Sequence, residues 1–183
     1  MTTILAVATP QGAYLGADSQ FSDESKRIFS SITPKIVKVG KFLVAGAGDC
    51  FPAELLSYHW KPPAYDQTPL IRFMGAKVVP SIAKVFKENN YDHLKEGNSF
   101  SFLFAFRGEI FELAEDLTVL QADSGIYGIG SGSDYGVGYL RAMQDAGKLD
   151  EDIHSNIKVA IEVASERDIY TGGKIHLEYQ PHP

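Results

Sequence analysis

Thr-Thr-Ile-Leu-Ala-Val-Ala-Thr-Pro-Gln-Gly-Ala-Tyr-Leu-Gly-Ala-Asp, residues 2–18, is the stretch that decides the fold. Residues 2–7 are apolar or β-branched, residues 10–12 form a turn sequence, and residues 13–17 are mostly apolar again before Asp18. Short apolar runs that a turn containing proline and glycine separates are typical of consecutive β-strands. The stretch therefore predicts two strands at the start of the domain.

Strand and helix patterns alternate in blocks along the rest of the chain. After a polar stretch over residues 18–31, further strands are predicted over residues 35–39, 42–46, 99–106, 109–113, 125–129 and 174–179. Helices are predicted over residues 51–60, from Thr68-Pro69 onward with a kink at Pro80, from a cap at Ser133 or Asp134 to about residue 147, and from Asp150 onward. This order predicts an α+β fold in which two antiparallel sheets stack face to face with helices outside.

Two of these segments have a clear amphipathic period. The strand over residues 99–106 has phenylalanine at every second position, so one of its faces carries an aromatic layer: Phe100, Phe102, Phe104 and Phe106. The last predicted helix has apolar residues at helical spacing: Ile153, Ile157, Ala160, Ile161 and Ala164. We expect both faces to be buried.

Composition and charge disfavour several classes of protein. The chain has 183 residues, of which 44% are hydrophobic and 22% charged, as expected for one globular domain over residues 1–183. Its net charge is −6, and its basic residues are not concentrated in one segment, so nucleic acid is not an expected partner. No apolar run is long enough for a membrane span, and the first residues lack the basic region of a signal peptide.

Cysteine and histidine usage points to neither disulfides nor metals. Cys50 is the one cysteine, so an internal disulfide is excluded and a reducing, cytoplasmic compartment is expected. Its expected place is either the core or the start of a helix. The five histidines show no metal-ligand spacing, so we expect no metal site.

The start of the chain also contains a candidate nucleophile. Thr2 follows Met1, and its small side chain favours removal of the initiator methionine. A free α-amine has a pKa near 7.7–8.0 and is a suitable base for the hydroxyl of the same residue. Because many chains begin with Met-Thr, this hypothesis needs support from other positions.

Five short segments supply that support, in the order and at the spacing of one enzyme family. They are Gly16-Ala17-Asp18-Ser19, Thr33-Pro34-Lys35, Ala45-Gly46-Ala47-Gly48-Asp49, Gly130-Ser131-Gly132-Ser133 and Arg167-Asp168-Ile169-Tyr170-Thr171-Gly172-Gly173. Together with Thr2, 16 residues before Asp18 (18 − 2), they make the chain resemble β-type proteasome subunits and their HslV-type relatives, from about residue 2 to residue 179. These proteins are N-terminal-nucleophile hydrolases. The resemblance implies a four-layer αββα sandwich, and it leaves open whether the chain is HslV-type or a small bacterial proteasome homologue.

The resemblance assigns the centre of the active site. It implies that Thr2 is the nucleophile, that Asp18 is the buried carboxylate beside it, and that Lys35 lies next to its hydroxyl. A lysine cation there would favour the alkoxide of Thr2, and Asp18 would keep that cation charged and oriented. Gly46 matches the glycine whose N–H forms the oxyanion hole. Gly48 is the alternative donor, because the loop after Gly46 is about one residue shorter than in the relatives.

The resemblance also assigns the residues around the amine and the substrate pocket. Ser131 and Asp168 match the residues that hold the amine of the threonine, and Thr171 stands where a serine is usual. The matched lining of the pocket for the side chain that precedes the cleaved bond is uncharged: Phe21, Thr33 and Val44. Such a pocket predicts cleavage after medium or large apolar residues, with acidic and basic ones slower.

These assignments predict a threonine-type endopeptidase that needs no cofactor and acts on peptides and unfolded proteins. The resemblance implies stacked homo-oligomeric rings with six or seven members, and in such families an ATP-driven unfoldase commonly feeds the chamber. Two alternatives stay open: a non-catalytic shell subunit, which retention of Met1 would favour, and an amidohydrolase of the same fold that acts on a small amide.

Overall fold

Two antiparallel sheets form the centre of the molecule. The structure, a computed structural model, describes residues 2–22 and 28–183. The first sheet contains, in spatial order, β10 (Ile126–Ile129), β1 (Ile4–Thr9), β2 (Gly12–Ala17) and β11 (His176–Pro181). The second contains β5 (Ile36–Val39), β6 (Phe42–Gly48), β7 (Phe100–Phe106), β8 (Glu109–Leu113) and β9 (Val119–Leu120). A short hairpin of β3 (Gln20–Ser22) and β4 (Ile28–Ser30) stands apart from both.

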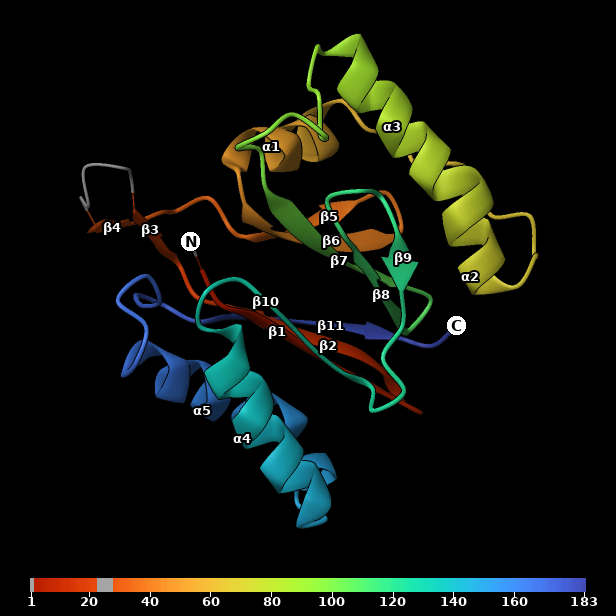
Figure 1. The fold of residues 1–183 in the computed structure, drawn as a ribbon. Coiled ribbons are helices and arrows are strands. Elements are labelled where there is room, and N and C mark those ends of the chain that lie inside the picture. The colour runs from red at the N-terminus through yellow and green to blue at the C-terminus, as the bar shows by residue number, and fades with distance from the viewer. Residues whose placement is uncertain (1, 23–27) are drawn as a thin grey trace.

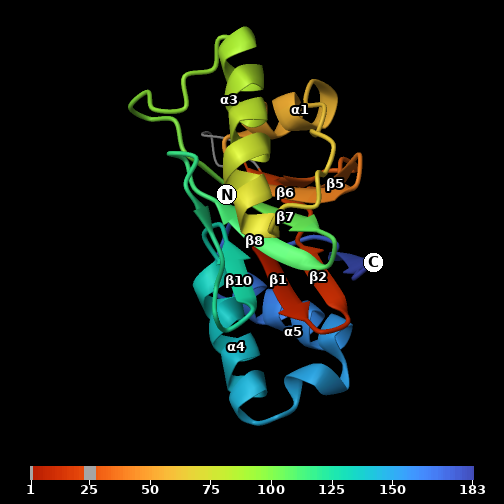
Figure 2. The ribbon, with the colours of Figure 1, turned by 90° about the vertical axis from the view of Figure 1, so that its right-hand side faces the viewer.

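Helices cover the outer face of each sheet, so the fold has four layers (Figures 1 and 2). The second sheet is covered by α1 (Cys50–Tyr58), α2 (Leu70–Phe73) and α3 (Val79–Glu88). The first sheet is covered by α4 (Ser133–Asp145) and α5 (Ile153–Ser165). The predicted α+β sandwich is therefore confirmed. No helix of the described residues is both long and apolar enough to cross a bilayer.

Side chains alternate between the two faces of each sheet, so three buried layers form: one between the sheets and one between each sheet and its helices. On β1, Ile4 and Ala6 face the second sheet, whereas Leu5 and Val7 face α4 and α5. On β7 the predicted aromatic face packs under α1 and α3, and all four phenylalanines are buried. The layer between the two sheets is rich in small side chains, which allow a close approach: Ala6, Ala13, Ala17, Ala45, Ala47 and Ala105.

Several boundaries differ from the predicted ones. The polar stretch over residues 18–31 contains β3 and β4, because Phe21 and Phe29 pair across the hairpin and their rings stack. A residue in the short β9, Val119, packs against the aromatic core, and this strand was not predicted. The cap of α4 is Gly132, and neither Ser133 nor Asp134 takes that position.

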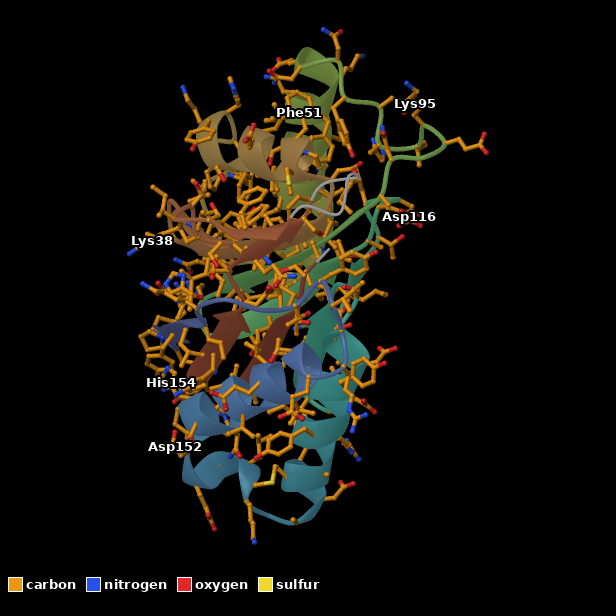
Figure 3. The ribbon with its side chains drawn as sticks, turned by 90° about the vertical axis from the view of Figure 1, so that its left-hand side faces the viewer. Lys38, Phe51, Lys95, Asp116, Asp152 and His154 are labelled. Carbon is orange, nitrogen blue, oxygen red and sulfur yellow. The ribbon has the colours of Figure 1, made fainter. Side chains whose placement is uncertain are left out.

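The helices around Pro80 and Asp150 also differ in detail. A π-helical turn (Met74–Val78) joins α2 to α3 just before Pro80, which has no N–H for the helical ladder. The segment at Asp150 is a short 3-10 turn, and α5 begins at Ile153 instead. Its cap is Asp152, whose carboxylate accepts a hydrogen bond of 2.9 Å from the N–H of Ser155. Asp152 lies beside His154 at this end of α5 (Figure 3).

Candidate active site

Strand β1 and its two neighbours place the threonines at the start of the chain. The pairing of Ile4 with Ala17 on β2 brings Thr3 opposite Asp18, whose N–H donates to the Thr3 carbonyl over 3.2 Å. The pairing of Ile4 with Ile129 on β10 brings the loop after β10 to the start of β1, where Gly130 lies against the Thr2 carbonyl oxygen. Because side chains alternate along β1, Thr2 points toward the second sheet and Thr3 toward the loop after α5.

Asp18 is the buried acceptor at the centre of the site, and it is only 1% exposed. Its Oδ1 accepts hydrogen bonds from the Thr2 hydroxyl and, over 3.0 Å, from the N–H of Thr3. Its Oδ2 accepts from the N–H groups of Gln20 at 3.1 Å and Gly172 at 3.0 Å. The three backbone donors fix the orientation of this carboxylate.

Lys35 immediately precedes β5 in the second sheet and reaches across to the first. Its Nζ donates to Thr2 Oγ1 and lies 2.7 Å from Asp18 Oδ1, and its side chain is only 5% exposed. Burial lowers the pKa of Lys35 below its usual value, although the neighbouring Asp18 carboxylate opposes that change. The structure therefore brings together Thr2, Asp18 and Lys35, although their sequence positions span more than thirty residues.

A second polar cluster contains the other predicted positions. Asp168 Oδ2 accepts hydrogen bonds from the hydroxyls of Ser131 at 2.7 Å and Thr171 at 2.6 Å. The Thr3 hydroxyl lies 2.6 Å from the Thr171 hydroxyl. Because the proton of Thr171 goes to Asp168, the proton in the bond between the two threonines comes from Thr3. Thr3 is completely buried, and it connects the two clusters, with its N–H on Asp18 and its hydroxyl on Thr171.

The loop after β10 requires glycine where it passes the start of β1. Gly130 has a φ of 93°, and a Cβ at this position would collide with the Thr2 carbonyl oxygen. An alanine there would be strained in its own backbone and would displace Thr2. The glycine therefore allows Ser131 to approach the start of β1.

A cavity of about 630 Å³ opens beside Thr2 and Lys35. Its lining includes all the residues predicted for substrate binding, and also Gly46: Phe21, Thr33, Val44, Gly46 and Gly48. The lining also includes acidic and sulfur-containing groups from the start of α1 and the residue before it: Asp49, Cys50 and Glu54. The cavity thus has acidic groups in addition to the three uncharged positions predicted for its lining. Cys50 is exposed at the first position of α1, which corrects its expected place in the core and agrees with the helix-start alternative.

The register of β5 and β6 distinguishes the two candidate glycines. Ile36 pairs with Ala45, so the next residue on each strand brings Lys35 opposite Gly46. Gly48 lies two residues farther along β6 and pairs with Phe100. Gly46 is therefore the nearer of the two to the lysine that contacts Thr2.

Comparisons with known proteins identify relatives over almost the whole chain. No family model matches the chain. The ATP-dependent protease subunit HslV of Campylobacter hominis is 30% identical over 178 residues, which cover 95% of this chain and 93% of that protein. Proteasome subunit beta type-9 of Mus terricolor is 26% identical, over 96% of this chain and 80% of that protein.

Solved structures share the fold across the whole chain. Thiobacillus denitrificans BPH superimposes with a TM-score of 0.76 at 23% identity, covering 99% of this chain and 98% of that one. The same protein is also known in complex with epoxomicin, again with a TM-score of 0.76 at 23% identity, over 99% of each chain. Eukaryotic HslV from Trypanosoma brucei has a TM-score of 0.68 at 19% identity, with coverage of 98% and 99%.

Proposed function

The chain belongs to the family of HslV and proteasome β-type subunits, and on this premise we propose that it is a threonine endopeptidase whose nucleophile is Thr2. The observation that carries the proposal is the contact of Thr2 Oγ1 with both Lys35 and Asp18 beside a cavity of about 630 Å³. Met1, whose removal the mechanism requires, lies outside the described residues.

The first half of the reaction forms an ester. Thr2 Oγ1 attacks the carbonyl carbon of the substrate, and its proton passes to the freed α-amine of Thr2, directly or through a water molecule. The Lys35 ammonium stabilises the developing charge on Oγ1. The N–H of Gly46 stabilises the tetrahedral oxyanion. When the C–N bond breaks, the proton moves from the α-amine to the departing amine, and the acyl group stays on Thr2.

The second half releases the acyl group. The α-amine takes a proton from water, the hydroxide adds to the ester carbonyl, and the proton returns to Thr2 Oγ1 as the ester bond breaks. Ser131, Asp168 and Thr171 hold the amine in place during both halves. Their mutual hydrogen bonds of 2.6–2.7 Å on one carboxylate oxygen support this positioning role.

The cavity lining favours apolar substrate side chains over acidic ones. Val44 and Phe21 provide apolar contact area, whereas Asp49 and Glu54 would repel a carboxylate. We propose that the substrates are peptides and unfolded proteins. We also propose that the subunits assemble into stacked rings and that an ATP-driven unfoldase delivers unfolded chains to them. The naming of a relative as a subunit of an ATP-dependent protease supports the ATP-driven delivery.

Intact-mass measurement of the purified full chain tests the proposal. We expect a mass that corresponds to a Thr2 terminus, and one added molecule of epoxomicin that Thr2→Ala no longer acquires. Thr2→Ala should also abolish cleavage of fluorogenic peptides while assembly is retained, and Thr2→Ser should keep part of the activity. Retained Met1 with no peptide cleavage would favour the alternative of a non-catalytic shell subunit.

A further inference from the structure

The aromatic ring of Phe21 lies against the Lys35 ammonium. Lys35 Nζ is 5.1 Å from the centroid of the Phe21 ring, within the range of about 6 Å in which a cation is attracted to a π face. The ammonium is also nearly buried, since the Lys35 side chain is 5% exposed. Loss of water strengthens this attraction, because water no longer competes for the cation.

Phe21 is held in place by its own hairpin. Phe21 on β3 pairs with Phe29 on β4, and their rings stack with centroids 5.9 Å apart and planes inclined by 20°. The N–H of Gln20, the residue before Phe21, donates to Asp18 over 3.1 Å. Phe21 is thus fixed relative to the same carboxylate that binds Lys35.

We propose that Phe21 is a positioning residue, which holds the Lys35 ammonium beside Thr2 through its π face in addition to lining the substrate cavity. This inference rests on the proposed function of Lys35. The ring differs in two chemical respects from a carboxylate placed at the same position. It attracts the cation but cannot take its proton, and it does not compete with Thr2 Oγ1 as a conventional hydrogen-bond acceptor.

The other groups around Lys35 explain why such support matters. Asp18 contacts the ammonium directly, and Asp168 and Cys50 act on it from farther away. Asp49 and Glu54 line the same cavity. Burial nevertheless lowers the pKa of Lys35, so desolvation outweighs the attraction to Asp18 and to the more distant Asp168. A substrate that fills the cavity excludes more water, and the Phe21 ring then continues to favour the charged form.

The test measures the pKa of Lys35 directly in the assembled full chain. Trace acetylation with acetic anhydride across a pH series, read at Lys35 by mass spectrometry, gives this value, and Lys35→Met identifies the signal. We expect Phe21→Leu to lower the pKa by about 0.5–1.5 and Phe21→Tyr, which keeps a π face, to leave it near the wild-type value. Phe21→Met is a second aliphatic variant if Phe21→Leu does not fold.

A matched control separates the π face from the shape of the hairpin. Phe29→Leu removes the stacked partner but keeps Phe21, so it should change the pKa of Lys35 less than Phe21→Leu does. We also expect Phe21→Leu to slow the labelling of Thr2 by epoxomicin about 3- to 10-fold at neutral pH. An unchanged pKa in Phe21→Leu, or an equal decrease in Phe29→Leu, would overturn the inference. Absence of Thr2 labelling in the wild type would instead contradict the proposed function, and the pKa comparison would still decide the role of Phe21.

Discussion

Replacement of Lys35 by methionine is the sharpest test of the proposed mechanism. Methionine keeps an unbranched apolar stem of similar length but removes the ammonium that contacts Thr2 Oγ1 and Asp18 Oδ1. The ammonium is a fixed charge in a site with little water, because the Lys35 side chain is 5% exposed and that of Asp18 is fully buried. Its effect on the developing alkoxide is therefore larger than that of an exposed charge.

The expected magnitudes differ for catalysis and stability. Removal of one preorganised group that stabilises transition-state charge costs about 10²–10³ in kcat, and we expect Lys35→Met to fall in or beyond this range. Removal of one partner of a buried ion pair costs about 3–5 kcal/mol when the other charge is left unpaired. Here Asp18 keeps the N–H groups of Thr3, Gln20 and Gly172. The expected loss in the free energy of unfolding is therefore only about 1–3 kcal/mol.

The assay combines single-turnover labelling of Thr2, steady-state peptide cleavage and denaturant unfolding of the same preparations. Lys35→Arg serves as the matched charged control, and it should remain slow because a planar guanidinium cannot take the position of the compact ammonium. Lys35→Met with a kcat within about threefold of the wild type would refute the assignment. So would a loss of kcat that follows the fraction of unfolded protein.

Four further predictions follow from the same contacts. Asp18→Asn places an amide NH₂ against backbone N–H donors whichever way the amide is turned. We expect it to reduce the free energy of unfolding by about 2–4 kcal/mol in denaturant unfolding and to abolish peptide cleavage. Thr3→Val removes the donor to Thr171 and should reduce kcat about tenfold with little change in KM, whereas Thr3→Ser should retain activity. Glu54→Gln should speed cleavage after acidic residues relative to apolar ones in a peptide-library profile, and an unchanged profile would remove Glu54 from the pocket. Burial lowers the pKa of Lys35 in the folded state, so the unfolded chain binds more protons at pH values between the folded and unfolded pKa. The free energy of unfolding should therefore rise with pH in that window, and denaturant unfolding of Lys35→Met should show no such rise.

The layered fold could be predicted from the sequence because most strands bury a face with a two-residue period. The aromatic face of β7 and the first hairpin have this period, and both strands of that hairpin lie in one sheet. The hairpin of β3 and β4 could not be predicted, because its strands have three residues each and lie in a polar stretch. Their pairing depends on Phe21 and Phe29, which are eight positions apart in the sequence (29 − 21) and become neighbours only in the fold.

Only part of the candidate site could be predicted from the sequence. Resemblance to a family identified Thr2, Asp18 and Lys35, which the structure places in direct contact. It did not identify Thr3 or Glu54. Alternation along β1 is a signal for Thr3, since it places that hydroxyl on the side opposite Thr2. Glu54 lies one helical turn after Cys50 on α1, and no pattern in the sequence indicates that this face of α1 borders the cavity.

The nucleophile and its activating lysine belong to different sheets, and this division makes their distance depend on how the sheets stack. Thr2 precedes β1 in the first sheet, and Lys35 precedes β5 in the second. Between the sheets, an isoleucine and an alanine pair at each of these strand ends: Ile4 with Ala17, and Ile36 with Ala45. A larger side chain there would hold the sheets farther apart, since buried layers are close-packed and have little room to relax. The packing of this layer therefore sets how closely a lysine of one sheet approaches a threonine of the other.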